Sequence, residues 1–308
     1  KKLEPLLLLP IAFGMLLSNL PMIKDSSAIM MHTEFFTNPE YMTDGKYINV
    51  GYICQHGGLL DLLYLGVKLG IYPPLIFVGI GCMTDFGPLI ANPKSILLGA
   101  AAQFGVFFTF VGALVLSALV PSINFGIKEA ASIGIIGGAD GPTAIYVTKS
   151  LAPALLPAIA VAAYSYMALI PVIQPPIMKL MTRKKDRMIV MEQLRPVSKT
   201  EKILFPIIVT IIVALIIPDA VSLVGCLMLG NLMKESGVVE RLTKMAQNEL
   251  MNIITLFLGV TVGATATASS FLSAQTIGII VLGLIAFCVG TAAGVLFGKV
   301  MCKVTHGK

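Results

Sequence analysis

The stretch GIIGGADGPTAIY, residues 134–146, places one carboxylate, Asp140, among glycines and a proline inside a long apolar run. Gly137 and Gly138 predict the end of one short helix, and Pro142 is typical of the first turn of another. A helix that ends leaves its last carbonyls without partners, and a helix that begins points its amide groups back at the break. The stretch therefore predicts two half-helices, over 130–138 and 142–149, that meet at Asp140.

The composition places this motif in a membrane protein. Of 308 residues, 56% are hydrophobic and only 12% are charged, and the mean hydropathy is +0.89. Soluble globular domains carry about 25% charged residues. Apolar stretches of about 20 residues recur, which is the length that crosses a bilayer as a helix. These runs are continuous rather than alternating, which disfavours a β-barrel. We expect an all-α membrane protein, a polytopic helical bundle with broken re-entrant helices.

Helical segments are expected along the whole chain, and one of them, 57–72, is expected to be an interfacial or half-buried helix because it carries Asp61 and Lys68, with Asp61 itself at the interface. The others are expected over 5–22, 74–90, 93–120, 155–181, 203–217, 221–233, 235–247, 250–268 and 274–300, with 93–120 the clearest spanning helix. Glycines and prolines interrupt the apolar runs at 83–88, 137–142 and 263–270. Irregular backbone at membrane depth is tolerated only where protein or a water-filled cavity satisfies it, so these breaks are candidate pockets.

Charge and cysteine usage narrow the function classes. Residues 182–202 carry seven basic residues against three acids, which predicts a cytoplasmic loop by the positive-inside rule. Nucleic-acid binding is disfavoured, since no soluble domain presents this basic segment. The five cysteines have no paired spacing and the three histidines are scattered, so neither disulfides nor a transition-metal site is expected.

Several short stretches recur at a nearly constant offset and in the same order. GGLLD (57–61) resembles SGVVE (236–240), FVGIG (77–81) resembles FLGVT (257–261), and MLLSNL (15–20) resembles LMLGNL (227–232). Small apolar alphabets also produce chance similarity, but the shared order favours a true repeat. With 182–202 inside, the mates 74–90 and 250–268 run in opposite directions, so inverted-topology repeats are expected. The predicted organisation is a first repeat over 1–181 with the GGADGP hairpin, the basic loop 182–202, and a second repeat over 203–308, incomplete at its C-terminus.

The gap between the half-helices offers hard oxygen ligands. Asp140 supplies a carboxylate, Thr143 a hydroxyl, and the end at Gly137 and Gly138 supplies carbonyl oxygens, a set that suits a small cation. The alternative is that Asp140 only caps the second half-helix. A carboxylate at mid-membrane depth costs roughly 2.5–3.5 kcal/mol, and such residues are functional by default.

Three further residues leave two interpretations open. Asp85, in MTDFGP, is either a helix cap or part of an ion pathway. Tyr166, in AAYSYMALIP, is either an aromatic core residue or a hydroxyl that relays a proton or binds a cation. Asn231 is expected to join helices through hydrogen bonds rather than to bind an ion.

The motif GIIGGADGPTAIY resembles the signature of the β subunit of sodium-pumping, biotin-dependent decarboxylases, which act on oxaloacetate, methylmalonyl-CoA or glutaconyl-CoA. Further blocks are similar to that family: EPLLLLPIAFGMLLSNLP (4–21), GIGCMTDFGPLIANP (79–93), NLMKESGVVERL (231–242) and AFCVGTAAG (286–294). The resemblance covers essentially the whole chain. It implies a fold similar to elevator-type carboxylate transporters with inverted repeats.

The resemblance also implies a reaction. Carboxybiotin, carried by another subunit, loses its carboxyl group at the cytoplasmic side, which consumes a proton and drives Na⁺ outward. Asp140 matches the family's sodium- and proton-handling carboxylate, and Tyr166 matches a hydroxyl of the site. The implied partners are a carboxyltransferase (alpha) subunit, a biotin carrier subunit, a small membrane (gamma/delta) subunit, the lipid bilayer of a bacterial inner membrane and further copies of the chain. No nucleic-acid partner is implied.

Two departures from the family pattern accompany the resemblance. Family members usually begin with one more hydrophobic segment, and they continue into a second signature beyond KVTHGK (303–308). We therefore expect the chain to be truncated at both ends. The rival hypothesis from another class is a stand-alone sodium–carboxylate symporter, which uses the same inverted repeats and broken helices without chemistry; a purely structural membrane scaffold is disfavoured by Asp140.

Overall fold

A computed structural model describes residues 8–20, 31–44, 47–189, 195–266 and 273–305. Within these residues the fold is built from helices, apart from a short antiparallel hairpin of β1 (Met42–Thr43) and β2 (Tyr47–Ile48). The α-helices are α1 (Leu8–Asn19), α2 (Val50–His56), α3 (Leu59–Lys68), α4 (Tyr72–Met83), α5 (Gly87–Ala91), α6 (Ile96–Ala102), α7 (Phe104–Leu119), α8 (Ile127–Gly134), α9 (Gly141–Leu151), α10 (Leu156–Met181), α11 (Lys199–Ile216), α12 (Val221–Ser236), α13 (Glu240–Met245), α14 (Met251–Ala264) and α16 (Ala274–Val304).

Shorter helical pieces join these elements. The 3-10 helices are η1 (Thr33–Phe36), η2 (Pro39–Tyr41), η3 (Pro93–Ser95), η4 (Ile135–Gly138), η5 (Pro153–Leu155), η6 (Asp186–Met188) and η7 (Pro218–Ala220), and η8 (Ala246–Leu250) is a π-helix. Proline opens η2, η3, η5 and η7, where its fixed φ suits a first turn and its missing N–H costs no hydrogen bond.

Several helices are long and apolar enough to cross a bilayer. In the described part of the chain, Pro93–Leu119 and Ala274–Val304 meet this criterion alone. Two bent pairs meet it together, α3 with α4 at 68° and the two halves of α10 at 59°. These single and paired spans confirm the expected all-α membrane fold. The long helix over 93–119 lies where the sequence predicts the clearest span.

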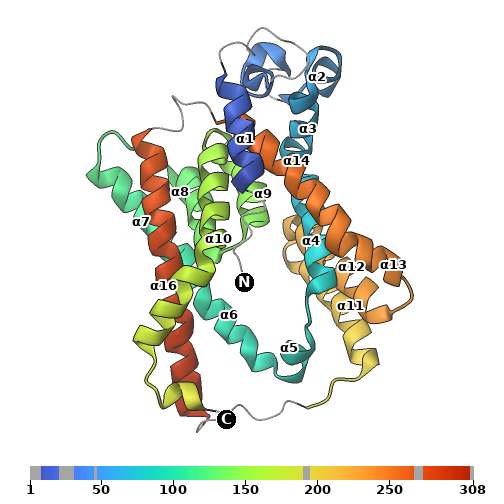
Figure 1. Ribbon diagram of the computed structural model, residues 1–308, viewed down its shortest axis with the longest axis vertical. Coiled ribbons are helices and arrows are strands. Elements are labelled where there is room, and N and C mark those ends of the chain that lie inside the picture. The colour runs from blue at the N-terminus through green and yellow to red at the C-terminus, as the bar shows by residue number, and fades with distance from the viewer. Residues whose placement is uncertain (1–7, 21–30, 45–46, 190–194, 267–272, 306–308) are drawn as a thin grey trace.

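The helices form two groups joined at the top and bottom of the view in Figure 1. On the left, α16 packs along α7, α10 and α6, and on the right α12 packs against α4 and α11. At the top, α1 packs against α14 beneath the segment that carries α2, and at the bottom α5 and α6 connect the two groups. Residues 182–189 lie on the same lower side, near the C-terminal end.

Helix α10 forms a shared wall between two buried cores. Tyr164 lies in a cluster with residues of α1, α3, α4 and α14, whereas Tyr166 lies in a second cluster with residues of α7, α8 and α16. Helix α9 contributes to both clusters as well, with Ile145 in the first and Ala144 in the second. The hairpin of α8 and α9 is therefore packed between the two cores.

The closest helix contact in the right-hand group joins α4 and α12. A Cβ on Gly81 would overlap the carbonyl oxygen of Leu227, and a Cβ on Gly230 would overlap that of Val78. Small residues at such a crossing let two backbones touch, which is how helices associate where lipid removes the hydrophobic driving force.

The position of Asp61 differs from the interfacial one expected. It is fully buried in α3 and accepts hydrogen bonds from the backbone N of His32 at 2.7 Å and the backbone N of Gly58 at 3.0 Å. The His32 ring nitrogen Nδ1 also lies 2.7 Å from its second oxygen. A buried carboxylate needs such partners, and here they tie the segment around η1 to α3.

Candidate functional site

The motif GGADGP forms a helical hairpin, with one difference from the expected backbone. Helix α8 ends at Gly134 and continues as the 3-10 turn η4, and the left-handed residue at the tip is Ala139, at φ 56° and ψ 34°, rather than a glycine. A left-handed conformation costs a non-glycine residue roughly 1–2 kcal/mol. The tip is therefore a strained position that the surrounding packing holds in place.

Asp140 begins the second half of the hairpin. Its backbone is extended, Pro142 follows in the first turn, and its Oδ1 accepts the backbone N–H of Thr143 at 3.2 Å. The Thr143 hydroxyl donates to Asp140 Oδ2 at 2.6 Å. The capping interpretation of Asp140 is thus correct in geometry, and it leaves the carboxylate oxygens and the Thr143 hydroxyl oxygen gathered at one point.

The carboxylate of Asp140 is partly buried and has no cationic partner in the described part of the chain. None of the ion pairs found among those residues includes it. Without a fixed counter-charge, these oxygens can coordinate a small cation. This arrangement is what an exchangeable cation site requires.

The two glycines of the motif serve packing more than the turn itself. A Cβ on Gly137 would overlap the carbonyl oxygen of Gly105 in α7, and a Cβ on Gly105 would lie 2.9 Å from the carbonyl oxygen of Gly137. Gly290 of α16 lies against the same point. Tertiary packing therefore explains why the glycines do not take the left-handed position of the turn. The tip lies against the backbones of α7 and α16, and only glycine permits that approach.

Tyr166 lies beside the hairpin without a hydrogen bond to Asp140 among the described residues. Its hydroxyl donates to the backbone carbonyl of Ile280 in α16, and its ring lies 5.6 Å from the ring of Phe287. It belongs to the same buried cluster as Ile136 of η4. The structure thus brings together Asp140, Thr143, Gly137 and Gly138 at the tip, and places Tyr166 as a support from α10.

Two buried hydroxyls near the hairpin were missed by the sequence analysis. Tyr164 and Thr148 have buried side-chain oxygens without a hydrogen-bond partner among the described residues, which is rare because such groups are nearly always satisfied. The sequence holds no signal for this pair, since a tyrosine or threonine inside an apolar helix is typical of packing.

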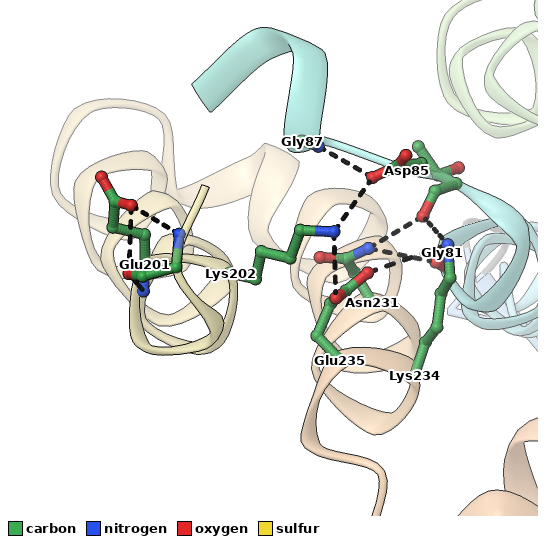
Figure 2. Close-up of polar contacts among 10 residues, drawn as sticks. Gly81, Asp85, Gly87, Glu201, Lys202, Asn231, Lys234 and Glu235 are labelled. Atoms are coloured by element: carbon green, nitrogen blue, oxygen red, sulfur yellow. Dashed lines mark hydrogen bonds and ion pairs between the residues drawn. The ribbon is translucent and has the colours of Figure 1, made fainter. Parts of the chain in front are cut away.

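Asp85 belongs to a different cluster, shown in Figure 2. Its Oδ1 accepts the backbone N–H of Gly87 at 2.9 Å and lies 3.8 Å from Lys202 Nζ. The backbone amide of Gly87 first, and the nearby Lys202 ammonium second, hold the pKa of Asp85 below its ordinary value. The side chain is 59% exposed. Its geometry is that of a cap with a paired lysine, and the pathway interpretation of Asp85 stays a prediction.

The end of α4 is closed by side chains from two other elements, and Figure 2 shows the two from α12. The carbonyl oxygen of Thr84 accepts hydrogen bonds from Asn231 Nδ2 at 3.0 Å and from Lys234 Nζ at 2.9 Å. Gln247 Nε2 donates to the carbonyl of Cys82 at 2.6 Å. These donors satisfy the carbonyls that a helix end leaves free, and Asn231 joins two helices as expected.

The sequence of this chain is similar to those of known proteins. The family model for the beta subunit of Na⁺-transporting oxaloacetate decarboxylase matches residues 1–308. A methylmalonyl-CoA decarboxylase subunit beta from Propionigenium modestum is 57% identical, over 99% of this chain and 75% of the relative. A glutaconyl-CoA decarboxylase subunit beta from Acidaminococcus fermentans is 53% identical, over 100% and 73%. An oxaloacetate decarboxylase beta chain from Klebsiella pneumoniae is 52% identical, over 98% and 76%.

These relatives favour a decarboxylase subunit over the stand-alone symporter. They differ in the acid or acyl-CoA that each name specifies, while the similarity to this chain is nearly equal. The chain therefore belongs to the family of beta subunits of sodium-transporting decarboxylases.

Proposed function

We propose that this subunit exchanges Na⁺ for a proton at Asp140 and couples that exchange to the decarboxylation of carboxybiotin. The observation that carries the proposal is the partly buried Asp140 carboxylate, held at the junction of two half-helices without a lysine or arginine partner among the described residues. Because a carboxylate at membrane depth is costly unless it has a function, the site needs a cation for part of its cycle.

The ligands proposed for Na⁺ come from both halves of the hairpin. Asp140 supplies carboxylate oxygens and Thr143 its hydroxyl oxygen, while the carbonyl groups of Gly137 and Gly138 complete the oxygen set from η4. The hydroxyl of Tyr164 adds support: it has no partner within the described part of the chain, and a buried group of this kind is satisfied by an ion or its water.

The coupling follows from the charge of the site. One carboxylate neutralises one cation, so a proton and Na⁺ compete for Asp140 at equilibrium. Decarboxylation requires a proton, which Asp140 or Tyr166 delivers, and Na⁺ leaves toward the outer side. The buried position of Tyr166 beside η4 fits a hydroxyl that relays a proton when the hairpin shifts.

The proposed setting is a bacterial inner membrane, crossed several times, with residues 182–202 in the cytoplasm. Carboxybiotin is delivered by a biotin carrier subunit after carboxyl transfer on an alpha subunit, and a small gamma or delta subunit accompanies the chain. A homo-oligomer is also proposed. The basic loop supports this orientation, and the relatives' names as beta chains support an assembly of different subunits.

Inverted repeats over 1–181 and 203–308 are part of the proposal, and two helix pairs support them. Helix α1 packs against α14, and α12, the mate of α1, packs against α4, the mate of α14. The aligned asparagines Asn19 and Asn231 donate to equivalent helix ends, the carbonyls of Ala266 and Thr84, each at 3.0 Å. A pseudo-twofold relation between the halves would produce both the matching helix contacts and the matching asparagine hydrogen bonds.

The decisive experiment replaces Asp140 by Asn in the complete decarboxylase, reconstituted in inverted vesicles. We expect Na⁺-dependent CO₂ release and Na⁺ uptake to be lost together, because the amide binds neither Na⁺ nor a proton as a carboxylate does. The matched control is Asp219→Asn, which removes an exposed aspartate in η7 and leaves coupled turnover. Coupled pumping by the Asp140→Asn complex would overturn the proposed function.

A further inference from the structure

A pocket of about 520 Å³ lies at the C-terminal end of α16, beside the segment that follows α10. One wall is α16, and the other is formed by Thr182, Asp186 and Ile189. Lys299 Nζ donates to the carbonyl oxygen of Met181, the last residue of α10, at 3.1 Å. The pocket therefore lies between the ends of two helices that are joined at this point, at the lower side of the view in Figure 1.

The length of α16 places this pocket at a membrane surface. The helix has 31 residues, which at 1.5 Å per residue is about 46 Å, whereas the hydrocarbon core of a bilayer is about 30 Å thick. The last turns of α16 therefore extend beyond the hydrocarbon. Since α10 ends directly before the basic residues 182–202, which are proposed to face the cytoplasm, the pocket lies at the level of the headgroups of the cytoplasmic leaflet.

One side of the pocket is apolar and open. Val295, Leu296 and Val300 of α16 line it together with Ile189. The side chain of Leu296 is 57% exposed and that of Val300 is 50% exposed. An apolar chain that lies along these residues removes their surface from water, which is favourable in proportion to the area covered. This side of the pocket therefore suits a hydrocarbon chain.

The other side of the pocket is basic. Lys299 lies 3.5 Å from Asp186 Oδ2, and together with its hydrogen bond to α10 this fixes its ammonium group in position. Lys303 lies one turn further along α16, is exposed, and takes part in none of the ion pairs found among the described residues. The single aspartate balances only one of the two lysines, so the lining carries a net positive charge.

We propose that this pocket binds an anionic phospholipid, with its phosphate at Lys299 and Lys303 and an acyl chain along Leu296 and Val300. Basic pockets between membrane helices on the cytoplasmic side suit anionic headgroups. An acidic peptide would pair with the lysines and leave the apolar side uncovered, and a neutral lipid would do the reverse. One anionic phospholipid meets both requirements. The inference goes beyond the proposed function and uses only its orientation of residues 182–202.

A lipid at this position would also affect the subunit itself. It contacts α16 on one side and the segment after α10 on the other, so it supports the junction that Lys299 makes between the two helices. A ligand that binds the folded protein and not the unfolded chain stabilises the fold. We therefore expect the melting temperature of the complex to rise with added anionic lipid.

The test uses the complete decarboxylase, delipidated in detergent and titrated with phosphatidylglycerol or phosphatidylcholine. Native mass spectrometry measures the lipid bound to each beta subunit. We expect phosphatidylglycerol to be retained and phosphatidylcholine to be lost. Lys303→Gln should weaken phosphatidylglycerol binding about fivefold, since each basic residue near an anionic surface contributes about 1 kcal/mol, and Lys303→Arg should keep the affinity. The matched control is Lys94→Gln, which removes an exposed lysine of η3 outside the pocket.

Three results would overturn the assignment. An equal loss in Lys94→Gln shows that binding follows the overall surface charge. Displacement of the lipid by an equal concentration of glycerol 3-phosphate shows a site for free anions without a role for the acyl chain. Unchanged affinity in Lys303→Gln removes the proposed headgroup contact, and loss of a partner subunit from that variant assigns the pocket to a protein instead.

Two further measurements keep the result interpretable. The melting temperature of each variant without added lipid detects a folding defect, and Lys303→Arg tests the charge where Lys303→Gln is unstable. Asp140→Asn is expected to bind phosphatidylglycerol as wild type does. Loss of Na⁺ pumping and loss of lipid binding are therefore separate outcomes, and either proposal can fail without the other.

Discussion

The hairpin tip and the end of α4 carry nearly the same sequence, ADGP and TDFGP, yet the two aspartates have different surroundings. Each accepts a backbone N–H from the first turn of the helix that follows, Thr143 for Asp140 and Gly87 for Asp85. Asp85 is exposed and lies 3.8 Å from Lys202. Asp140 is partly buried, and no ion pair of the described chain includes it.

This difference separates a structural aspartate from an exchangeable one. A lysine that stays beside a carboxylate supplies the positive charge that Na⁺ or a proton would otherwise supply. At the tip, the neutral hydroxyl of Thr143 is the only side-chain partner of Asp140 among the residues that the structure describes. The local motif therefore builds the cap in both places, and the neighbouring helices decide whether the carboxylate is free to exchange cations.

The largest expected effect comes from giving the hairpin the counter-charge that the α4 end has. Thr143→Lys places an ammonium group one turn from Asp140, and a pair of charges at 4 Å is worth about 4 kcal/mol at an effective dielectric of 20. Na⁺-dependent turnover is expected to vanish up to molar Na⁺. CO₂ release is measured as a function of Na⁺ concentration, with Thr143→Met as a control for side-chain size. Wild-type stimulation of the lysine variant by Na⁺ would contradict the distinction drawn between Asp85 and Asp140.

A smaller effect is expected when only the hydroxyl is removed. Thr143→Val deletes the donor that lies 2.6 Å from Asp140 Oδ2, together with one proposed ligand. Hydrogen bonds to charged groups contribute about 1.5–3 kcal/mol, so the half-saturating Na⁺ concentration should rise at least tenfold. Thr143→Ser is expected to restore most of the affinity, and a serine variant as weak as valine would show that the methyl packing matters instead.

The reverse experiment removes the counter-charge at the α4 end. Lys202→Met leaves Asp85 without that lysine, but the side chain stays exposed and capped by Gly87. We expect turnover within about twofold of wild type and a loss of at most about 1 kcal/mol in stability, as for exposed ion pairs. Steady-state turnover rates and the melting temperature in detergent measure these two effects. A changed Na⁺ dependence of turnover in Lys202→Met would contradict the structural role given to Asp85.

The smallest effect concerns acid stability beside the same end of α4. Hydrogen bonds from Arg195, and next from the backbone of Ser198, lower the pKa of Glu201 to about 2. Since the folded-state pKa is below the unfolded value of about 4.3, the stabilisation is present above pH 4.3 and is lost as the pH falls toward 2. The melting-temperature difference between wild type and Glu201→Gln should disappear across that window, and a constant difference would contradict it.

Sequence patterns were sufficient for features that depend on local chemistry. The hairpin lies where GGADGP predicts it, because a capping aspartate and a proline act within one helix turn. The use of Ala139 for the left-handed tip was not predictable, since the contact of Gly137 with α7 is set by tertiary packing. The burial of Asp61 depends on His32, which lies 29 residues away and follows no periodic pattern.

The close crossing of Gly81 and Gly230 has a consequence for how the molecule moves. Two backbones in direct contact, with side chains locked on either side, cannot slide or rotate past each other without collision. Helices α4 and α12 therefore form one rigid unit. Any conformational change of the subunit has to move both helices together, and the backbone has to bend in the segments that flank the pair.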